Sequence, residues 1–245
     1  MTCAAIYYTL LSFVGGQIAP NAGVYANVEV ITEPGSIVHA SYPFPVVAAN
    51  TETANRLVDI LMGALAQAYP KKVSAGGYGS ACVYTLGGTD PASQKAFVHY
   101  ETIGGGMGGT ASNAGPSGLR VHMGNTMNLP IEGVEAALPV LFHEYAIARH
   151  LSGQGMYPGG GGVRKIIEVL TDGVQTSVLG ERTMTPARGV AGGGDGGLAS
   201  FTLVSDGVGR PLDSKSGPHR LKCGDKLVMV TAGGGAWGQS TQRKT

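Results

Sequence analysis

The sequence predicts an α+β fold in which a helix-containing N-terminal third is followed by a glycine-rich, mainly antiparallel β region. Three observations support this prediction. Residues 51–68 carry apolar side chains at helical spacing, short apolar runs of strand length recur after residue 80, and clusters of glycine separate those runs. We expect the 245 residues to form one region with a soft internal boundary near 111–118.

Two helices are expected in the N-terminal third. Residues 3–14 form an apolar run that ends at two glycines, and residues 51–68 follow a candidate N-cap, Asn50, with Pro70 just beyond the end. The second helix is predicted to bury Leu57, Leu61 and Leu65 and to present a polar face. That polar face carries Arg56, Asp59 and Gln67. Between the helices, residues 28–32 are expected to form a strand.

The remainder of the chain is predicted to be mostly strands. Apolar and alternating runs mark the candidates, which are 81–86, 96–103, 119–123, 141–148, 163–170, 174–184, 199–205 and 226–231. Residues 132–138 are expected to form one or two helical turns. Four glycine clusters, at 104–109, 159–162, 192–197 and 233–238, fall between strands. Each is therefore expected to be a loop or a close approach of two backbones.

The amino-acid composition limits which classes of molecule we expect the chain to bind. The formal net charge is +1, so no bulk field attracts nucleic acid or an anionic membrane surface, and we expect neither as a partner. Charged residues make up 13%, about half of the usual share of roughly 25%, which predicts a surface that packs against other protein chains. Three widely spaced cysteines indicate reduced thiols, and no long apolar run is present. A cytoplasmic location follows.

The sequence has no complete motif for nucleotide binding. Gly104, Gly106 and Gly109 match a dinucleotide fingerprint, but residues 110–118 form turns and offer no helix N-terminus for a pyrophosphate. The sequence has no phosphate-binding loop, so this chain is expected not to bind ATP. The six histidines show no tight ligand spacing, and we assign no metal to the chain.

Two groups of polar residues are candidate sites. Asn50 and Glu52 stand at a helix start, where they either cap the helix or bind a ligand. Glu52 is expected to keep a low pKa there. The second group is Glu101, before a glycine cluster, with His122, Asn125 and Asn128. Amides with a histidine and a carboxylate suit holding a carbonyl substrate and moving a proton, or they satisfy loop backbone.

The same residues resemble the hydantoinase B/oxoprolinase family. The resemblance rests on Tyr100–Gly108 (YETIGGGMG) and on Val121–Glu132 (VHMGNTMNLPIE), and it continues through Asn50–Thr53, Gly153–Ile167 and Gly233–Gly238. Gly124 stands where the family usually has threonine, and an Arg149–Ser152 stretch replaces a commoner polar one. The segments follow the family order along nearly the whole chain.

The resemblance implies a component of an ATP-dependent enzyme complex. A hydantoinase A-like partner would hold ATP with Mg²⁺ and phosphorylate an oxygen of a small-molecule substrate. The present chain would correspond to the C-terminal portion of a typical member, either as a naturally split subunit or as a degenerate or truncated fragment. A separate chain would supply the N-terminal portion, whose NDP…GGxHxxD-like stretch is associated with a divalent metal.

The sequence leaves three possible functions open. The complex hydrolyses a cyclic amide, or it carboxylates a ketone as acetone and acetophenone carboxylases do, or this chain is a non-catalytic structural subunit. The isolated chain is expected to be inactive. In the first two cases Glu101, His122, Asn125 and Asn128 would be the catalytic residues, and Asn50 and Glu52 would bind substrate in a composite pocket.

Overall fold

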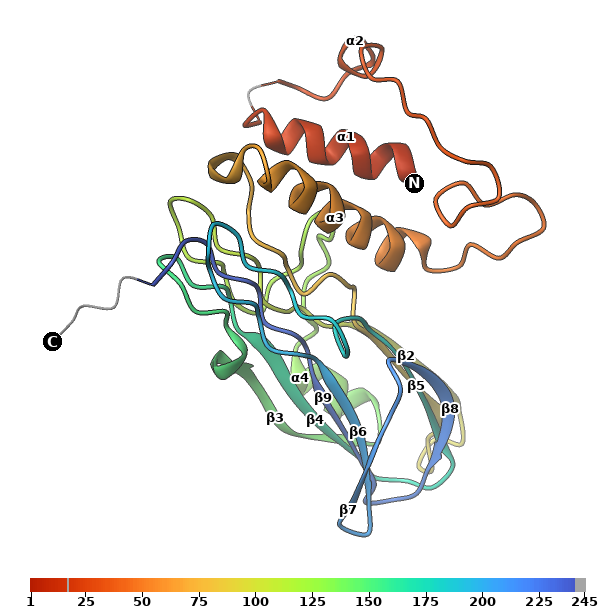
Figure 1. Ribbon diagram of the computed structural model, residues 1–245. Coiled ribbons are helices and arrows are strands. Elements are labelled where there is room, and N and C mark those ends of the chain that lie inside the picture. The colour runs from red at the N-terminus through yellow and green to blue at the C-terminus, as the bar shows by residue number, and fades with distance from the viewer. Residues whose placement is uncertain (17, 241–245) are drawn as a thin grey trace, which may run out of the picture.

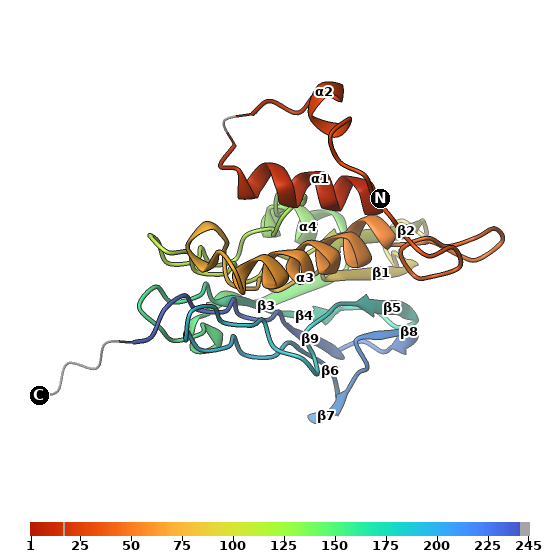
Figure 2. The ribbon, with the colours of Figure 1, turned by 45° about the horizontal axis from the view of Figure 1, so that its top comes forward.

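A computed structural model describes residues 1–16 and 18–240 of the protein. Helices α1 (Thr2–Phe13) and α3 (Ala54–Ala66) lie side by side at one end, with the short α2 (Ala22–Tyr25) outside them (Figures 1 and 2). A π-helical turn, Ala49–Thr53, leads directly into α3. Two single 3₁₀ turns follow, Pro70–Lys72 just after α3 and Arg149–Leu151 later in the chain.

The two long helices share a small apolar core of their own. Ala5 of α1 and Val58 and Met62 of α3 are buried there, together with Val73. The predicted core residues Leu57, Leu61 and Leu65 are only half-buried. The buried face of the helix is centred on Val58 and Met62, each one residue after a predicted core leucine. The reason is that the edge of α3 carrying Asp59 contacts the β region.

Within the described residues, nine strands form two antiparallel sheets. One sheet has the order β2-β1-β5-β8, and the other has the order β3-β4-β9-β6-β7. The strand bounds are β1 Val83–Thr89, β2 Ala96–Thr102, β3 Val140–Ala148, β4 Gly162–Val169, β5 Val174–Leu179, β6 Ser200–Ser205, β7 Val208–Pro211, β8 Lys215–Leu221 and β9 Lys226–Val230. A short helix, α4 (Ile131–Ala137), precedes β3.

The inward residues of both sheets belong to one apolar core. Tyr84 and Leu86 of β1 meet Ile167 of β4 and Phe201 of β6 in the same buried cluster. In β4 the buried positions alternate with half-buried ones from Val163 to Val169, as expected for a strand with one face on a core. The α+β prediction is therefore confirmed, with the sheets packed as a sandwich.

The glycine clusters pack backbone against backbone between the helices and the sandwich. Gly160 N–H donates to the Met107 carbonyl at 2.8 Å, and Gly234 N–H donates to the Gly160 carbonyl at 2.9 Å. A Cβ placed on Gly234 would lie 1.9 Å from the Met107 oxygen, closer than any side chain can approach. The predicted close approaches are confirmed. Extended segments from four parts of the chain meet with no room for side chains.

Seven of the predicted strands match strands of the structure, and two predictions are wrong. Residues 28–32 form no strand, and residues 119–123 contribute only an isolated bridge between Leu119 and Gly105. The backbone of the second segment turns at His122, whose φ is 51°. Strands β7 and β8 were not predicted, because their polar, glycine- and proline-containing sequences lack strand character. Among the described helices, none combines the length and apolar character needed to cross a bilayer.

Replacing Gly234 with alanine should destabilise the chain by about 3 kcal/mol or more, because the new methyl group meets rigid backbone that cannot move aside. The matched control is Gly63→Ala in α3, where an added Cβ has no atom within 4 Å. That change should stabilise by about 0.5–1 kcal/mol through helix propensity. Urea unfolding of both variants measures the difference, and equal midpoints would contradict the packing argument.

Candidate functional site

Three recesses lie along α3. The asparagine cavity, of about 300 Å³, is lined by Asn50, Asn55, Arg120, Gly124 and Asn125 among others. The lysine groove, of about 420 Å³, includes Lys71, Lys72 and His122. The arginine groove, of about 430 Å³, includes Arg56, Asp59, Arg182 and Arg188. Loop 120–126 contributes to the first two recesses, and α3 contributes to all three.

The asparagine cavity brings together two of the predicted site residues. Asn125 comes from the loop after His122, and Asn50 comes from the π-helical turn before α3. Asn50 does not cap the helix, contrary to the sequence prediction. Ala48, in the left-handed conformation with φ 61°, precedes the turn instead, and the exposed Asn50 side chain is left to line the cavity.

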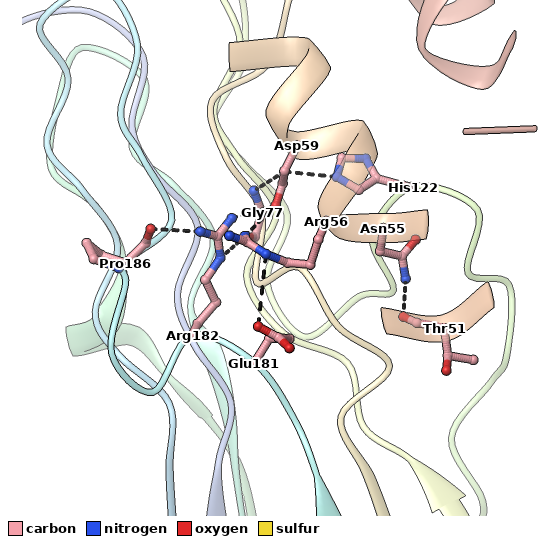
Figure 3. Close-up of polar contacts among 9 residues, drawn as sticks. All are labelled: Thr51, Asn55, Arg56, Asp59, Gly77, His122, Glu181, Arg182 and Pro186. Carbon is pink, nitrogen blue, oxygen red and sulfur yellow. Dashed lines mark hydrogen bonds and ion pairs between the residues drawn. The ribbon is translucent and has the colours of Figure 1, made fainter. Parts of the chain in front are cut away.

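His122 is held by a buried carboxylate from α3. Its Nε2 lies 3.0 Å from Asp59 Oδ1, and the two side chains are 9% and 6% exposed (Figure 3). Asp59 also accepts a hydrogen bond from the Gly77 N–H at 3.2 Å and another from Arg182. Burial alone would raise the pKa of Asp59, but the hydrogen bond and charge of His122, then Arg182 and Gly77, lower it overall. Asp59 is therefore an anion.

The anionic state of Asp59 determines which histidine nitrogen carries a proton. An ionised carboxylate only accepts hydrogen bonds, so His122 Nε2 must carry the hydrogen that Asp59 receives. In the neutral ring the lone pair is then on Nδ1, and this nitrogen is the one able to take a proton. A carboxylate that fixes the tautomer and orientation of a histidine is the arrangement that general base catalysis uses.

Asp59 is the main site residue that the sequence analysis missed. It was placed on the polar face of the helix with Arg56 and Gln67, a position that normally faces solvent. In the structure Arg182, which is 5% exposed on its side chain, crosses from the β region to pair with it. Arg182 also donates to the carbonyls of Gly77 and Pro186 (Figure 3). No sequence signal links residue 59 with residue 182.

Glu101 lies inside the β sandwich and lines none of the three recesses. Its carboxylate accepts from Lys165 Nζ at 2.7 Å, from Tyr84 and, at 3.3 Å, from His99 when Nε2 carries the proton. The Lys165 ammonium in turn lies over the ring of Tyr145, 4.2 Å from its centroid. Burial would raise the pKa of Glu101, but His99, Lys165 and Tyr84 lower it to about 2. The structure thus places this predicted catalytic residue in a closed polar network.

Glu52 and Asn128 also lie outside the recesses. Glu52 is 5% exposed, and its Oε1 accepts from the Ala81 N–H at 3.2 Å. Burial raises its pKa, so the expectation of a low pKa at a helix start is wrong. The π-helical turn buries the carboxyl instead of leaving it beside free N–H groups in solvent. Asn128 is exposed. Its catalytic role stays a prediction.

No group of three or more histidine, cysteine, aspartate or glutamate side chains within residues 1–16 and 18–240 is arranged to hold a metal ion.

Comparison with known proteins places these features in a family. The family model described as hydantoinase B/oxoprolinase matches residues 1–240. The chain belongs to this family. It is 32% identical to 5-oxoprolinase 1 of Arabidopsis thaliana over 98% of its length, and 28% identical to a component of a putative D-/L-hydantoinase of a Pseudomonas strain over the same share.

A solved relative has the same fold. The crystal structure of the ATP-dependent caprolactamase of Pseudomonas jessenii matches 96% of this chain with a TM-score of 0.79 and 26% identity. The present chain spans only part of these relatives: 42% of the caprolactamase chain, 41% of the hydantoinase component and 18% of the oxoprolinase. The residues that line the three recesses all lie within residues 1–240, which the family model matches.

Replacing Glu101 with glutamine should cost about 3 kcal/mol or more in the free energy of unfolding at pH 7. The change leaves the Lys165 ammonium buried without its counter-ion. Glu144→Gln is the control, because its ion pair with Arg164 is about two-fifths exposed and contributes less than about 1 kcal/mol. Chemical unfolding of both variants tests this. Similar losses in the free energy of unfolding for the Glu101→Gln and Glu144→Gln variants would contradict a structural role for Glu101.

Replacing Asp59 with asparagine should lower stability at pH 7 by about 3 kcal/mol, because Arg182 then has no charged partner. The folded-state pKa of Asp59 is depressed. Its stabilising effect is therefore complete above its ordinary pKa of about 4 and is lost as pH falls through the lower folded value. The difference in the free energy of unfolding between this variant and the parent protein should shrink below pH 4. Asp206→Asn, at an exposed turn, is the control, and a gap that is constant with pH would refute the assignment.

Proposed function

We propose that this chain is a component of an ATP-dependent complex that hydrolyses a cyclic amide. The observation that carries the proposal is the His122–Asp59 pair, a histidine fixed by a buried carboxylate in a region shared almost entirely with the caprolactamase fold. The names of the oxoprolinase and hydantoinase relatives support the same class of substrate. Because the chain spans less than half of those relatives, further protein must complete the site.

The proposed reaction needs activation of the amide, because an unactivated amide resists attack by water. A hydantoinase A-like partner holds ATP with Mg²⁺ and transfers the terminal phosphoryl group to the amide oxygen. Water then adds to the activated carbon, and cleavage of the C–N bond releases the amine and leaves an acyl phosphate. A second water hydrolyses the acyl phosphate to a carboxylate and inorganic phosphate. A divalent metal, where one takes part, is held by the family's N-terminal portion or by a partner.

The residues of this chain have two proposed roles. His122, oriented by Asp59, accepts the proton of the attacking water through Nδ1 and returns it to the leaving nitrogen. Asn125 and Asn50 line the asparagine cavity and hold the polar atoms of the substrate. His122 lines the lysine groove, a different recess, so the proposal requires loop 120–126 to bring His122 and Asn125 to the same substrate in the assembled complex.

The test is turnover by the complex reconstituted with its ATP-binding partner and the remaining family segment. ATP-dependent ring opening of lactams and hydantoins is expected, with no consumption of acetone and bicarbonate. Carboxylation of acetone would replace this proposal with the ketone carboxylase alternative. ATP hydrolysis that does not depend on this chain would favour the non-catalytic alternative.

His122→Ala and Asn125→Ala should each lower this turnover by roughly a hundredfold, the scale of one lost general base or oxyanion donor. His219→Ala and Gln175→Ala, on the distant strands β8 and β5, are the controls and should leave turnover near normal. Size-exclusion chromatography checks that every variant still assembles. Normal turnover in both site variants would remove the two residues from the mechanism.

A further inference from the structure

The lysine groove has a basic lining without a carboxylate. Lys71 and Lys72, in the 3₁₀ turn after α3, line it together with His122. Within the part of the chain that the structure describes, no aspartate or glutamate lines this groove. Both lysines are exposed, and among the described residues neither of them forms an ion pair. The groove therefore offers two positive charges that no carboxylate of the described chain neutralises.

The arginine groove on α3 differs, although it is also basic. Arg182 and Arg56 pair with Asp59, and Arg188 pairs with Asp195. Each guanidinium group on the wall of that groove is thus already matched by a carboxylate, and an anionic ligand would have to compete with it. Of the two basic recesses, the lysine groove is the one whose charge is available to an anion.

The ammonium group of Lys72 lies beside the wall that α1 contributes to the lysine groove. Its Nζ is 5.3 Å from the centroid of the Phe13 ring, and Ser12, the preceding residue, lines the groove. A lysine carries its charge on a flexible four-carbon stem, so the ammonium group can turn from the ring to a ligand without movement of the backbone. A charge-assisted hydrogen bond to an anion is stronger than an exposed cation–π contact.

Hydroxyl and amide groups complete the lining of the lysine groove. Ser12 and Ser74 line it near the lysines, and Thr110, Ser112 and Asn113 line it from the loop that follows a glycine cluster. The Asn113 N–H donates to Thr110 Oγ1 at 3.0 Å, a bond that orders this loop. Lysine ammonium groups with nearby hydroxyl and amide donors are a combination that binds phosphate oxygens.

We propose that the lysine groove binds the phosphoryl group that the activated substrate carries. This inference deepens the proposed function and rests on it. In that reaction the phosphorylated amide and the acyl phosphate both carry the phosphoryl group on the oxygen next to the carbon that water attacks. A groove that holds this group keeps both intermediates beside His122, which lines the same groove. Its positive charge also stabilises the phosphate as it leaves.

The remaining lining suits the carbon skeleton of such a ligand. Met62, Met107 and Val121 are apolar residues of the groove wall, and the volume of about 420 Å³ is within the range of small-ligand sites. A phosphate ester with an apolar ring should therefore bind more tightly than inorganic phosphate, because the ring adds apolar contacts to the same charge interaction.

The experiment is calorimetry on the full chain without the ATP-binding partner, so that no nucleotide site of the partner competes for phosphate. The probes are cyclohexyl phosphate, inorganic phosphate and cyclohexanol. Cyclohexyl phosphate should bind at least about tenfold more tightly than inorganic phosphate. Cyclohexanol, which lacks the phosphoryl group, should show no binding at the same concentrations. Added sodium chloride should weaken the binding of both phosphates.

Two variants test the lysines. Lys71→Gln and Lys72→Gln each remove one positive charge and should each weaken the binding of cyclohexyl phosphate by roughly tenfold. Lys95→Gln, at an exposed position outside the groove, is the matched control and should leave the binding unchanged. Urea unfolding should give the same midpoint for the three variants and the parent protein, which separates loss of the site from loss of the fold.

The outcomes separate this proposal from the proposed function. Equal affinity for inorganic phosphate and cyclohexyl phosphate would assign the groove to free phosphate and overturn the proposal. Unchanged affinity in both lysine variants would also overturn it, even where the reconstituted complex opens lactams with ATP. The expected binding pattern in a chain whose complex shows no ATP-dependent ring opening would instead refute the proposed function and leave the phosphate ester site in place.

Discussion

The structure depends on the packing of glycine backbones without side chains between them. Segments around residues 106, 160 and 234 meet so closely that a Cβ on any of the three would lie within about 2 Å of backbone from another segment. Their N–H and C=O groups then bond to different neighbours, as when Gly109 donates to Gly235 and Gly235 donates to Gly76. Hydrogen bonding and steric exclusion act together here, because extended chains reach this spacing only where both lack side chains. Many of the 41 glycines, although not all, lie in this packing.

The same packing positions the candidate site. A Cβ on Gly77 would lie 2.7 Å from the Val121 side chain, so glycine at this position lets loop 120–126 approach. The Gly77 N–H donates to Asp59, and the residue after Val121 is His122, whose positive φ turns its ring toward the same carboxylate. Segments distant in the sequence are thus placed within hydrogen-bonding distance by the backbone alone. The geometry of the His122–Asp59 pair therefore depends on the glycine packing.

Local patterns of the sequence were sufficient for the fold class, for most strands and for the close approach of the glycine clusters. They failed where a long-range contact overrode a local preference. Residues 119–123 have strand character, yet their backbone groups bond to the glycine segment, as Leu119 does with Gly105. Asp59 has the spacing of a solvent-facing residue, and its long-range contacts with Arg182, His122 and Gly77 accompany its burial.

Two buried carboxylates, Glu101 and Asp59, differ in a way that bears on function. Glu101 is enclosed between two sheets, and Lys165 and its aromatic neighbours complete its surroundings. This network links the two sheets, and Glu101 lines none of the three recesses, so its catalytic role stays a prediction. Asp59 is similarly buried, but it lies on the wall of one recess and bonds to a histidine on the wall of another. Proton transfer to substrate requires a group that is held firmly and still reachable. Asp59, through His122, meets both conditions.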